Sequence, residues 1–268
     1  VNYIENYAKV ISLDHGAVLF KLYPYQKRII KAMHANRKVI AKLFRQAGKS
    51  TVVAAYVAWY TLFNDFKRSA ILANKMAIAR EIFSRVQFII ESLPFWLQQG
   101  VKEWNKTSFE LDNGSACFCA ASSPSAIRGK SINVLILDEF AHLDNNLADD
   151  FIASVFPTIS SSEESKLILV STPKGMNSFY KMWVDAKKGI NGFIPVEGQW
   201  QEHPARNQKW ADEQLAILGQ VRYSQEISCE FAGSAKTLID GRKLINIPFF
   251  EPLFEEKNLK IYQKPVKG

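Results

Sequence analysis

A short segment between an apolar run and a helical pattern has the residue types of a phosphate-binding loop. The apolar run covers residues 38–44, and the segment after it reads Arg45-Gln46-Ala47-Gly48-Lys49-Ser50-Thr51. Backbone N–H groups at such a strand-to-helix turn surround phosphate oxygens, and the helix dipole favours their negative charge. Lys49 would reach the terminal phosphates, and the Ser50 hydroxyl would bind Mg²⁺. Because Leu43 replaces the usual first glycine, the sequence predicts a variant nucleotide-binding loop.

A pair of carboxylates at the end of a second apolar run could complete the same site. Residues 132–141 read Ile-Asn-Val-Leu-Ile-Leu-Asp-Glu-Phe-Ala, which is typical of a buried parallel strand that ends at Asp138 and Glu139. Ligand sites of α/β proteins form at the carboxyl ends of such strands. We expect Asp138 to hold the Mg²⁺ shell and Glu139 to orient and polarise an attacking water. By itself, the pair could be two acidic residues that face solvent at the end of a strand. Together with the phosphate-binding loop, it indicates an enzyme that hydrolyses a nucleotide.

The elements that would position these groups alternate between strand and helix patterns. This alternation predicts an α/β fold with a mainly parallel sheet between helices. The predicted strands cover residues 38–44, 69–74, 115–121, 134–138, 167–171 and 193–196. The predicted helices cover residues 25–35, 49–63, 77–92, 145–155, 177–187 and 208–218, the last of them ended by Gly219.

The composition is that of a globular protein with one large core and room for a small second domain. The chain has 268 residues, of which 47% are hydrophobic and 22% are charged. Its net charge of +8 fits a polyanionic partner, although scattered surface lysines give the same excess. Cys117, Cys119 and Cys229 form no CxxC pair, which argues against a disulfide framework and a zinc site. No apolar stretch has the length of a membrane span.

Two further segments could contribute to nucleotide binding. Tyr25 and Gln26 precede the loop, and there a ring can stack on adenine while an amide pairs with its edge, although the segment also suits an ordinary helix start. Ser171 and Thr172 end another apolar run. Their hydroxyls could sense the γ-phosphate, although Ser and Thr are common in turns. We expect the first pair to hold adenine and the second to couple hydrolysis to movement.

The remaining polar residues leave more than one role open. Arg45, inside the loop, could neutralise charge on the transferred phosphoryl group. Arg128 could contact a phosphate in its own or a neighbouring subunit, or simply be solvated. His142 and His203 lack metal-ligand spacing, so we expect surface or capping roles. Basic residues that could follow a phosphate backbone, or form solvated helix faces, are Lys27, Arg28, Lys31, Arg37, Lys38 and Lys42, and then Lys174, Lys181, Lys187 and Lys188.

In order and spacing, these motifs resemble those of the large terminase subunit of tailed bacteriophages, particularly the T-even-like branch. The resemblance rests on Tyr25-Gln26, RQAGKST, IRGKSINVLILDE, LVSTPKGMNSFYKMW and pieces of the run from Trp200 to Ile239, and it spans roughly residues 22–240. The family implies a RecA/helicase-like P-loop ATPase core with a small lid subdomain. It also implies that the strand ending at Ser171 lies between the loop strand and the acidic strand.

The resemblance implies the N-terminal ATPase domain of a motor that uses ATP and Mg²⁺ to drive double-stranded DNA into a procapsid. Arg45 is then an arginine finger within its own subunit, and Arg128 is a candidate finger that acts on a neighbour. The implied partners are DNA, the portal protein, the small terminase subunit and further copies of the chain in a homo-oligomeric ring of five. The isolated domain could instead be a monomer. The implied location is the portal vertex in the cytoplasm of the infected host, away from any membrane.

The same resemblance suggests a division of the chain. We expect residues 23–198 to form the core, residues 1–22 with 199–250 to form the lid, and residues 251–268 to form a linker towards a nuclease domain that the chain lacks. No strand-borne acidic cluster follows Ile239, so we expect no nuclease activity. Two alternatives stay open: a helicase-like DNA translocase, which would need a second core or a C-terminal arginine motif, and a nucleotide-gated scaffold that does not hydrolyse ATP.

Overall fold

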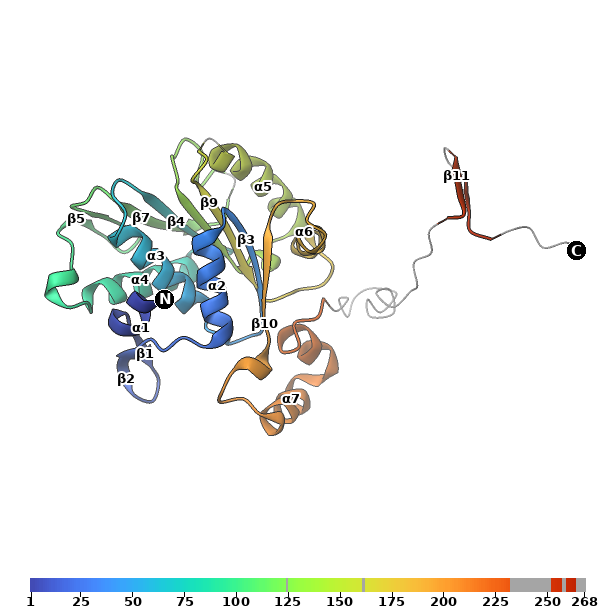
Figure 1. Cartoon of the computed structure of the whole chain (residues 1–268), viewed down its shortest axis with the longest axis horizontal. Coiled ribbons are helices and arrows are strands. Elements are labelled where there is room, and N and C mark those ends of the chain that lie inside the picture. Colours follow the sequence, from blue (N-terminus) through green and yellow to red (C-terminus); the bar gives the residue numbers. More distant parts are fainter. Residues whose placement is uncertain (124, 161, 232–251, 257–258, 264–268) are drawn as a thin grey trace, which may run out of the picture.

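A mainly parallel eight-stranded sheet runs through the middle of the protein (Figure 1). The computed structural model describes residues 1–123, 125–160, 162–231, 252–256 and 259–263. The strand order is β10-β3-β9-β8-β4-β7-β6-β5, parallel from β10 to β7 and antiparallel beyond. The strands are β3 (Lys38–Leu43), β4 (Arg68–Ala73), β5 (Val101–Trp104), β6 (Ser108–Leu111), β7 (Ala116–Ala121), β8 (Val134–Asp138), β9 (Lys166–Ser171) and β10 (Ile194–Gly198). The predicted α/β fold is confirmed.

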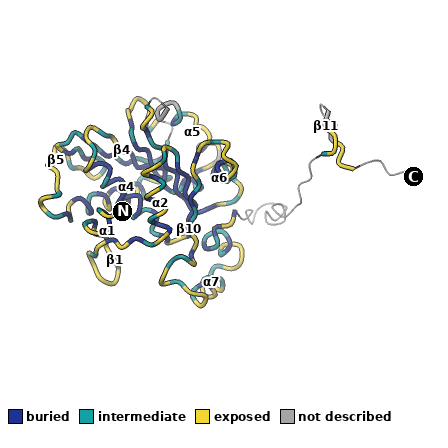
Figure 2. The backbone as a smooth tube through the Cα atoms, viewed as in Figure 1, coloured by how far each residue is buried: buried dark blue, intermediate teal, exposed yellow. Residues whose placement is uncertain are grey.

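Helices cover both faces of this sheet. Three helices, α2 (Pro24–Ala35), α3 (Lys49–Leu62) and α4 (Met76–Glu91), share one hydrophobic cluster with one face of the strands. The other face packs against α5 (Asn145–Ser160) and α6 (Ser178–Lys187). Since both faces are covered, the central strands are buried along their length (Figure 2). Among the described residues, no helix is long and apolar enough to cross a membrane.

Side chains at three helix starts fix where these helices begin. The Gln26 amide oxygen accepts a hydrogen bond from the Tyr23 N–H at 3.0 Å, and Pro24 occupies the first turn of α2. Asn177 begins α6 by accepting the Tyr180 N–H at 3.2 Å. Asn207 does the same at α7 (Gln208–Glu226), where it accepts the Trp210 N–H at 3.0 Å.

Some elements were absent from the sequence prediction or extend beyond it. The antiparallel strands β5 and β6 have four residues each, too short for a clear alternating pattern. Gly219 interrupts α7 with non-helical backbone, φ 70° and ψ 162°, so the predicted helix does end there, and a second helical piece that was not predicted continues to Glu226. The short elements α1 (Asn2–Tyr7), β1 (Lys9–Ser12), β2 (Gly16–Leu19), η1 (Phe95–Leu97), η2 (Phe140–His142) and η3 (Trp200–Glu202) were also not predicted.

The first 22 residues pack on the helical layer of the core. The helix α1 contacts α3, and β1 contacts α4, with Ile4, Ala8, Phe20 and Leu22 buried in the same cluster as those helices. The helix α7 lies beyond the end of β10 (Figure 1). Residues 232–250 of the predicted lid lie outside the described residues. So does most of the predicted linker, apart from β11 (Phe254–Glu256), β12 (Leu259–Ile261) and adjacent residues. The division into core, lid and linker stays a prediction.

The central strand β8 offers a direct test of the two-sided core. Ile136 is completely buried, so Ile136→Ala should lower the free energy of unfolding by about 2 to 5 kcal/mol through lost contacts and a cavity. The matched change Ile190→Ala, at a side chain 69% exposed, should change it by less than about 0.5 kcal/mol. Urea unfolding measures both. Equal losses in the two variants would contradict the packing described.

Candidate active site

The predicted phosphate-binding loop connects β3 to α3 through backbone conformations that suit few residues. Gly48 precedes the first helical residue with φ 73° and ψ 25°, in the left-handed region. A Cβ atom at this position would lie 2.8 Å from Nε2 of Gln26, so any larger residue would meet both backbone strain and a clash. Gln46 also has a positive φ of 62°. The turn directs the start of α3, with Lys49 and Ser50, towards the carboxyl edge of the sheet.

Tyr25 and Gln26 support this loop from beneath. The Tyr25 hydroxyl and the Gln26 amide both donate hydrogen bonds to the Ala47 carbonyl, at 2.9 and 3.0 Å. Both residues are buried, and the Tyr25 ring packs edge-on against Phe44 at 5.7 Å between centroids. Burial raises the pKa of the Tyr25 hydroxyl, which keeps it a neutral donor. Both side chains are engaged in supporting the loop, and their role in holding adenine stays a prediction.

The two chemistry-bearing stretches meet at one point. The Lys49 ammonium lies 3.4 Å from Oε1 of Glu139, and the Ser50 hydroxyl lies 3.2 Å from Oδ2 of Asp138. These groups come from the start of α3 and the end of β8. They converge because β9 pairs in parallel with both β3 and β8, which brings all three carboxyl ends to the same edge.

Asp138 has an environment that suits a magnesium ligand. The residue is only 2% exposed, and its Oδ1 has no hydrogen-bond partner among the described residues. Burial, with the neighbouring charge of Glu139, raises its pKa from 3.8 to about 7, against the opposing effects of Lys49 and Ser50. No group of three or more His, Cys, Asp or Glu residues among those described could hold a metal by itself. A site of Ser50, Asp138 and nucleotide oxygens fits Mg²⁺, which keeps several waters and few protein ligands.

Glu139 is held as a charged group in a strained backbone turn. Its φ of 53° and ψ of 38° lie in the left-handed region, where a residue with a side chain pays about 1 to 2 kcal/mol. Burial opposes ionisation, but the charge of Lys49 and a hydrogen bond from Thr172 outweigh it and lower the pKa of the Glu139 carboxyl. Strain of this kind is concentrated at functional sites, and here it aims a carboxylate at the loop.

The predicted coupling residues lie beside this carboxylate. Ser171 ends β9, and its hydroxyl accepts the Ala141 N–H at 3.1 Å and lies 3.4 Å from Oε2 of Glu139. The Thr172 hydroxyl donates to the same Oε2 at 3.2 Å. The structure also brings in His142, for which the sequence predicted a surface or capping role. The position of His142 three residues after Glu139 was the available signal.

Arg45 is held by the end of α7. Its guanidinium pairs with Oε2 of Glu226 at 2.5 Å, and its backbone N–H donates to the Glu226 carbonyl at 2.7 Å. Glu226 is the last residue of α7, so this pair ties the end of that helix to the loop. The Arg45 side chain remains 62% exposed, so it can leave Glu226 for another partner.

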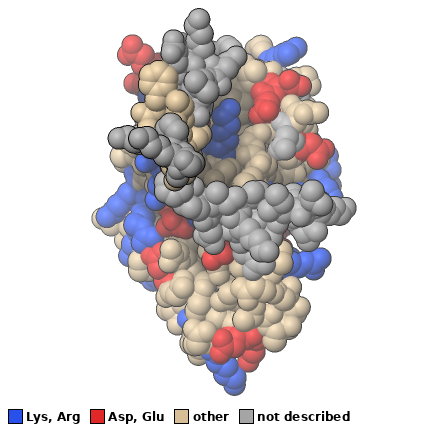
Figure 3. Space-filling view, turned by 90° about the vertical axis from the view of Figure 1, so that its right-hand side faces the viewer, with Lys and Arg blue, Asp and Glu red and all other residues tan. Residues whose placement is uncertain are grey.

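Arg206 is a second residue that links this part of the chain to the loop, and sequence reasoning did not identify it. Its guanidinium lies 4.0 Å from the Trp210 ring centroid and 5.1 Å from that of Phe44. One nitrogen donates to the Gln46 side-chain oxygen at 3.2 Å. Burial lowers the pKa of Arg206. The contact could not be foreseen without the fold, because 160 residues separate Arg206 from Gln46. On the side where α6 and α7 lie, basic and acidic side chains are both exposed among the described residues (Figure 3).

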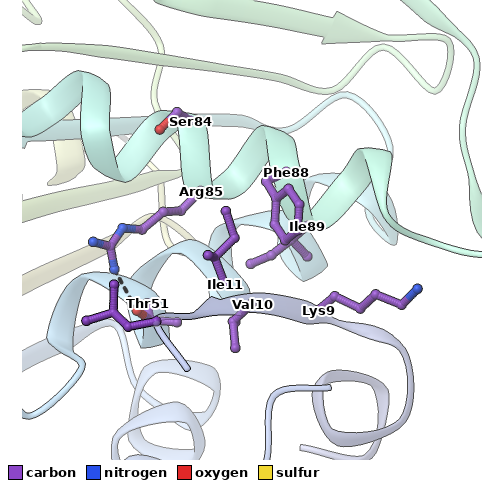
Figure 4. Close-up of a pocket in the computed structure, with 9 residues that line it drawn as sticks. Lys9, Val10, Ile11, Thr51, Ser84, Arg85, Phe88 and Ile89 are labelled. Atoms are coloured by element: carbon purple, nitrogen blue, oxygen red, sulfur yellow. Dashed lines mark hydrogen bonds between the residues drawn. The ribbon is translucent and has the colours of Figure 1, made fainter. Parts of the chain in front are cut away.

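Two predicted residues lie at the border of the site. The Thr51 hydroxyl accepts a hydrogen bond from Arg85 of α4 at 2.8 Å, beside a cavity of about 320 Å³ between α3, α4 and β1 (Figure 4). This contact fixes Thr51 away from the carboxylates. Arg128 lies in the turn before β8, and its side chain is exposed with no ion pair to any described residue.

Comparison with known proteins identifies a consistent set of relatives. Residues 44–245 match the family model described as terminase large subunit, T4likevirus-type, N-terminal. The large terminase subunit of Thermus virus P23-45 is 28% identical in an alignment 265 positions long that covers 86% of this chain and 54% of that protein. The subunit of Thermus phage G20c matches over the same shares of both chains. The chain thus spans about half the length of these relatives.

Solved structures share the fold. The large terminase of bacteriophage HK97 superposes with a TM-score of 0.69 at 17% identity, over 85% of this chain and 53% of that one. The ATPase domain of the Thermus phage P74-26 large terminase has a TM-score of 0.64 at 22% identity, over 79% and 94%. The large terminase of another thermophilic bacteriophage, solved with ATP-gamma-S, has a TM-score of 0.61 at 13% identity, over 79% and 53%.

The buried Asp138 predicts a pH-dependent stability cost. A carboxyl whose folded pKa is raised contributes fully below its unfolded pKa of 3.8, and that contribution is lost as the pH rises towards about 7. Without metal and nucleotide, Asp138→Asn should therefore be more stable than the wild type by about 2 to 4 kcal/mol at about pH 8. Urea unfolding across a pH series should show this gain disappear near about pH 4. A gain that does not vary with pH would contradict the assignment.

Proposed function

The chain belongs to the family of T4likevirus-type terminase large subunits, and we propose that it is the ATPase part of a motor that moves double-stranded DNA into a viral procapsid. The observation that carries the proposal is the convergence of Lys49 and Ser50 with Glu139 and Asp138 at one edge of the sheet. These four groups are the set that a P-loop ATPase requires. Because the chain covers 54% of its relatives, the activity and partners of the whole protein are part of the proposal.

Binding of the nucleotide would use the loop and the start of α3. Backbone N–H groups of residues 46–51 would surround the phosphates, and Lys49 would pair with their terminal oxygens. Ser50 and Asp138 would hold Mg²⁺, which would neutralise negative charge on the phosphates. Oδ1 of Asp138, which has no partner among the described residues, supports this role. The ATP-gamma-S complex of the thermophilic bacteriophage terminase adds support for a nucleotide in this fold.

Hydrolysis would depend on the release of Glu139 from Lys49. In the structure, the ammonium faces Oε1 of Glu139, whereas Oε2 is held by Thr172. When Lys49 turns to a phosphate, Oε1 becomes free to orient and polarise a water for attack. The lowered pKa of Glu139 keeps this carboxylate ionised at neutral pH. Ser171 and Thr172 would report the state of the carboxylate to β9 and the segment that follows.

Arg45 would act on the phosphates only after it leaves Glu226. Its present ion pair joins the loop to the end of α7, so an exchange of Glu226 for the γ-phosphate would change what holds α7. Arg45 would then stabilise charge in the transition state, as an arginine finger within its own subunit. This exchange gives hydrolysis a physical connection to the movement of α7.

The proposed assembly is a homo-oligomeric ring of five subunits at the portal vertex, with the portal protein, the small subunit and DNA as partners in the host cytoplasm. Arg128 would reach a neighbour's nucleotide, which the exposure of its side chain permits. Several basic residues of the first predicted cluster are engaged within the chain: Lys27 with Glu5, Arg28 with Glu202, and Lys42 with Glu197. A DNA-facing role is therefore more consistent with the second cluster.

The two alternatives are less well supported. The family match favours packaging over a repair translocase. A scaffold that does not hydrolyse ATP would have no need for a strained, ionised Glu139 next to Lys49. The described geometry therefore favours a hydrolytic motor.

The first test removes the water-orienting carboxylate. Glu139→Ala should retain Mg²⁺–ATP binding, because Lys49, Ser50 and Asp138 remain, and should lose turnover by about 10² to 10³-fold. Phosphate release under single-turnover conditions and binding of a fluorescent ATP analogue measure the two properties. Turnover close to that of the wild type would contradict the role of Glu139, and no turnover in the wild type with Mg²⁺ and DNA would favour the scaffold.

The second test addresses Arg45. Arg45→Ala should lower turnover by about 10³-fold or more, because an arginine finger stabilises charge that exists only in the transition state. Affinity for ATP should change much less. The matched control Arg80→Ala, at an exposed arginine of α4, should hydrolyse ATP as the wild type does. If both variants keep full turnover, Arg45 serves only to hold Glu226.

A further inference from the structure

His142 contacts the proposed water-orienting carboxylate, yet the hydrolysis steps above give it no role. It ends the short helix η2, which follows directly after Glu139. Its Nε2 lies 3.4 Å from Oε2 of Glu139 and 3.4 Å from the Thr172 hydroxyl. The imidazole is partly buried, with a side-chain exposure of 32%. A histidine in this position is not explained by capping, since its ring faces the catalytic groups.

Three polar atoms surround a single carboxylate oxygen. The Thr172 hydroxyl donates to Oε2 of Glu139 at 3.2 Å. Nε2 of His142 lies close to both this carboxylate oxygen and the Thr172 hydroxyl. The Ser171 hydroxyl is 3.4 Å from the same Oε2. The other oxygen, Oε1, faces Lys49. The two oxygens of Glu139 therefore have separate surroundings: one is held by β9 and η2, and the other faces the loop.

The chemistry of the groups determines the direction of the hydrogen bonds. An ionised carboxylate oxygen only accepts, so a hydrogen bond to it requires a proton on Nε2. Burial, together with the charges of Lys174 and Lys49, lowers the pKa of His142 against the opposing effect of Glu139. A neutral ring with its proton on Nε2 satisfies both conditions at neutral pH. Such a ring adds a donor without adding a charge next to Lys49.

We propose that His142 is a positioning residue that holds Oε2 of Glu139 together with Thr172, so that Oε1 is presented to the attacking water. The left-handed backbone at Glu139 sets the approximate direction of the side chain. The hydrogen bond from Thr172 and the imidazole 3.4 Å from the same oxygen then limit the rotation of the carboxylate. The inference rests on the proposed hydrolysis of ATP and deepens it. It also joins the coupling residue Thr172 to the carboxylate through a second, independent contact.

The consequence for turnover follows from geometry. Without the imidazole, the carboxylate would still be present and ionised, but it would rotate more freely about its terminal bond. Misplacement of a catalytic group by about 1 Å costs roughly 10²-fold in rate. Nucleotide binding uses the loop, Lys49, Ser50 and Asp138, none of which His142 contacts in the described structure. A loss confined to the chemical step therefore distinguishes positioning from a general structural role.

Three substitutions separate the ring's Nε2 from its bulk. His142→Ala should lower single-turnover hydrolysis roughly 10- to 100-fold, with KM for ATP and ATP-analogue binding unchanged. His142→Gln places an amide nitrogen near the position of Nε2 and should recover most of the rate. His142→Asn places its amide near the position of Nδ1 and should resemble the alanine variant. His15→Ala, at an exposed histidine between β1 and β2, should match the wild type.

A double variant shows whether His142 acts through Glu139. In the Glu139→Ala background, His142→Ala should cause no further loss, because the group that it positions is gone. The proposal would be overturned if His142→Ala lowered turnover by the same factor in the Glu139→Ala background as in the wild type. It would also be overturned if His142→Ala alone kept wild-type turnover. If Gln and Asn variants have equal rates, the position of the nitrogen has no role and the proposal also fails. Failure of the proposed function would look different: the wild type would not hydrolyse ATP, or Glu139→Ala would remain active.

Discussion

The parallel pairing of β9 with both β3 and β8 determines where every proposed catalytic group lies. Each pairing aligns carboxyl ends, so the loop after β3, the hydroxyls at the end of β9 and the carboxylates at the end of β8 meet at one edge. The contacts of Lys49 with Glu139 and of Ser50 with Asp138 follow from this register. A shift of one residue between strands would reverse which side chains face each sheet surface and would separate these groups. The two-sided packing that buries β8 and β9 makes such a shift costly.

The site is arranged at a cost to the stability of the fold. Glu139 occupies a left-handed backbone conformation, and Asp138 buries a carboxyl with one oxygen that no described residue partners. Both features oppose folding, and strain of this kind is concentrated at functional sites. The connections to α7 are of a different kind, since Arg45 and Arg206 reach the loop through exposed or partly exposed contacts that can exchange. The rigid part of the site is thus the sheet edge, and the adaptable part is its border with α7.

Local patterns in the sequence predicted the sheet and the convergence of its two main motifs. Apolar runs identified β3, β4, β7, β8 and β9, and the Gly-Lys-Ser loop with Asp138-Glu139 indicated the site. The position of β9 between β3 and β8 came from resemblance, because strand order is not a local property; the structure confirms it. The roles of Tyr25 and Gln26 were harder to foresee, since the Ala47 carbonyl that they bind is exposed to them only after α2 packs under the loop. Arg206 was missed for the same reason, because Gln46 lies 160 residues away in the sequence. His142 follows Glu139 by three positions, but its contact with Thr172 depends on the pairing of β8 with β9.

The most direct measurement of the central claim is the location of the cation in a crystal of this protein grown with a non-hydrolysable ATP analogue and Mn²⁺ in place of Mg²⁺. Anomalous scattering from manganese identifies its position without ambiguity. The account predicts the metal bound to the Ser50 hydroxyl, with Asp138 in direct contact or one water away, and the terminal phosphate beside Lys49. A metal and triphosphate bound elsewhere, with Lys49 still paired to Glu139, would contradict it.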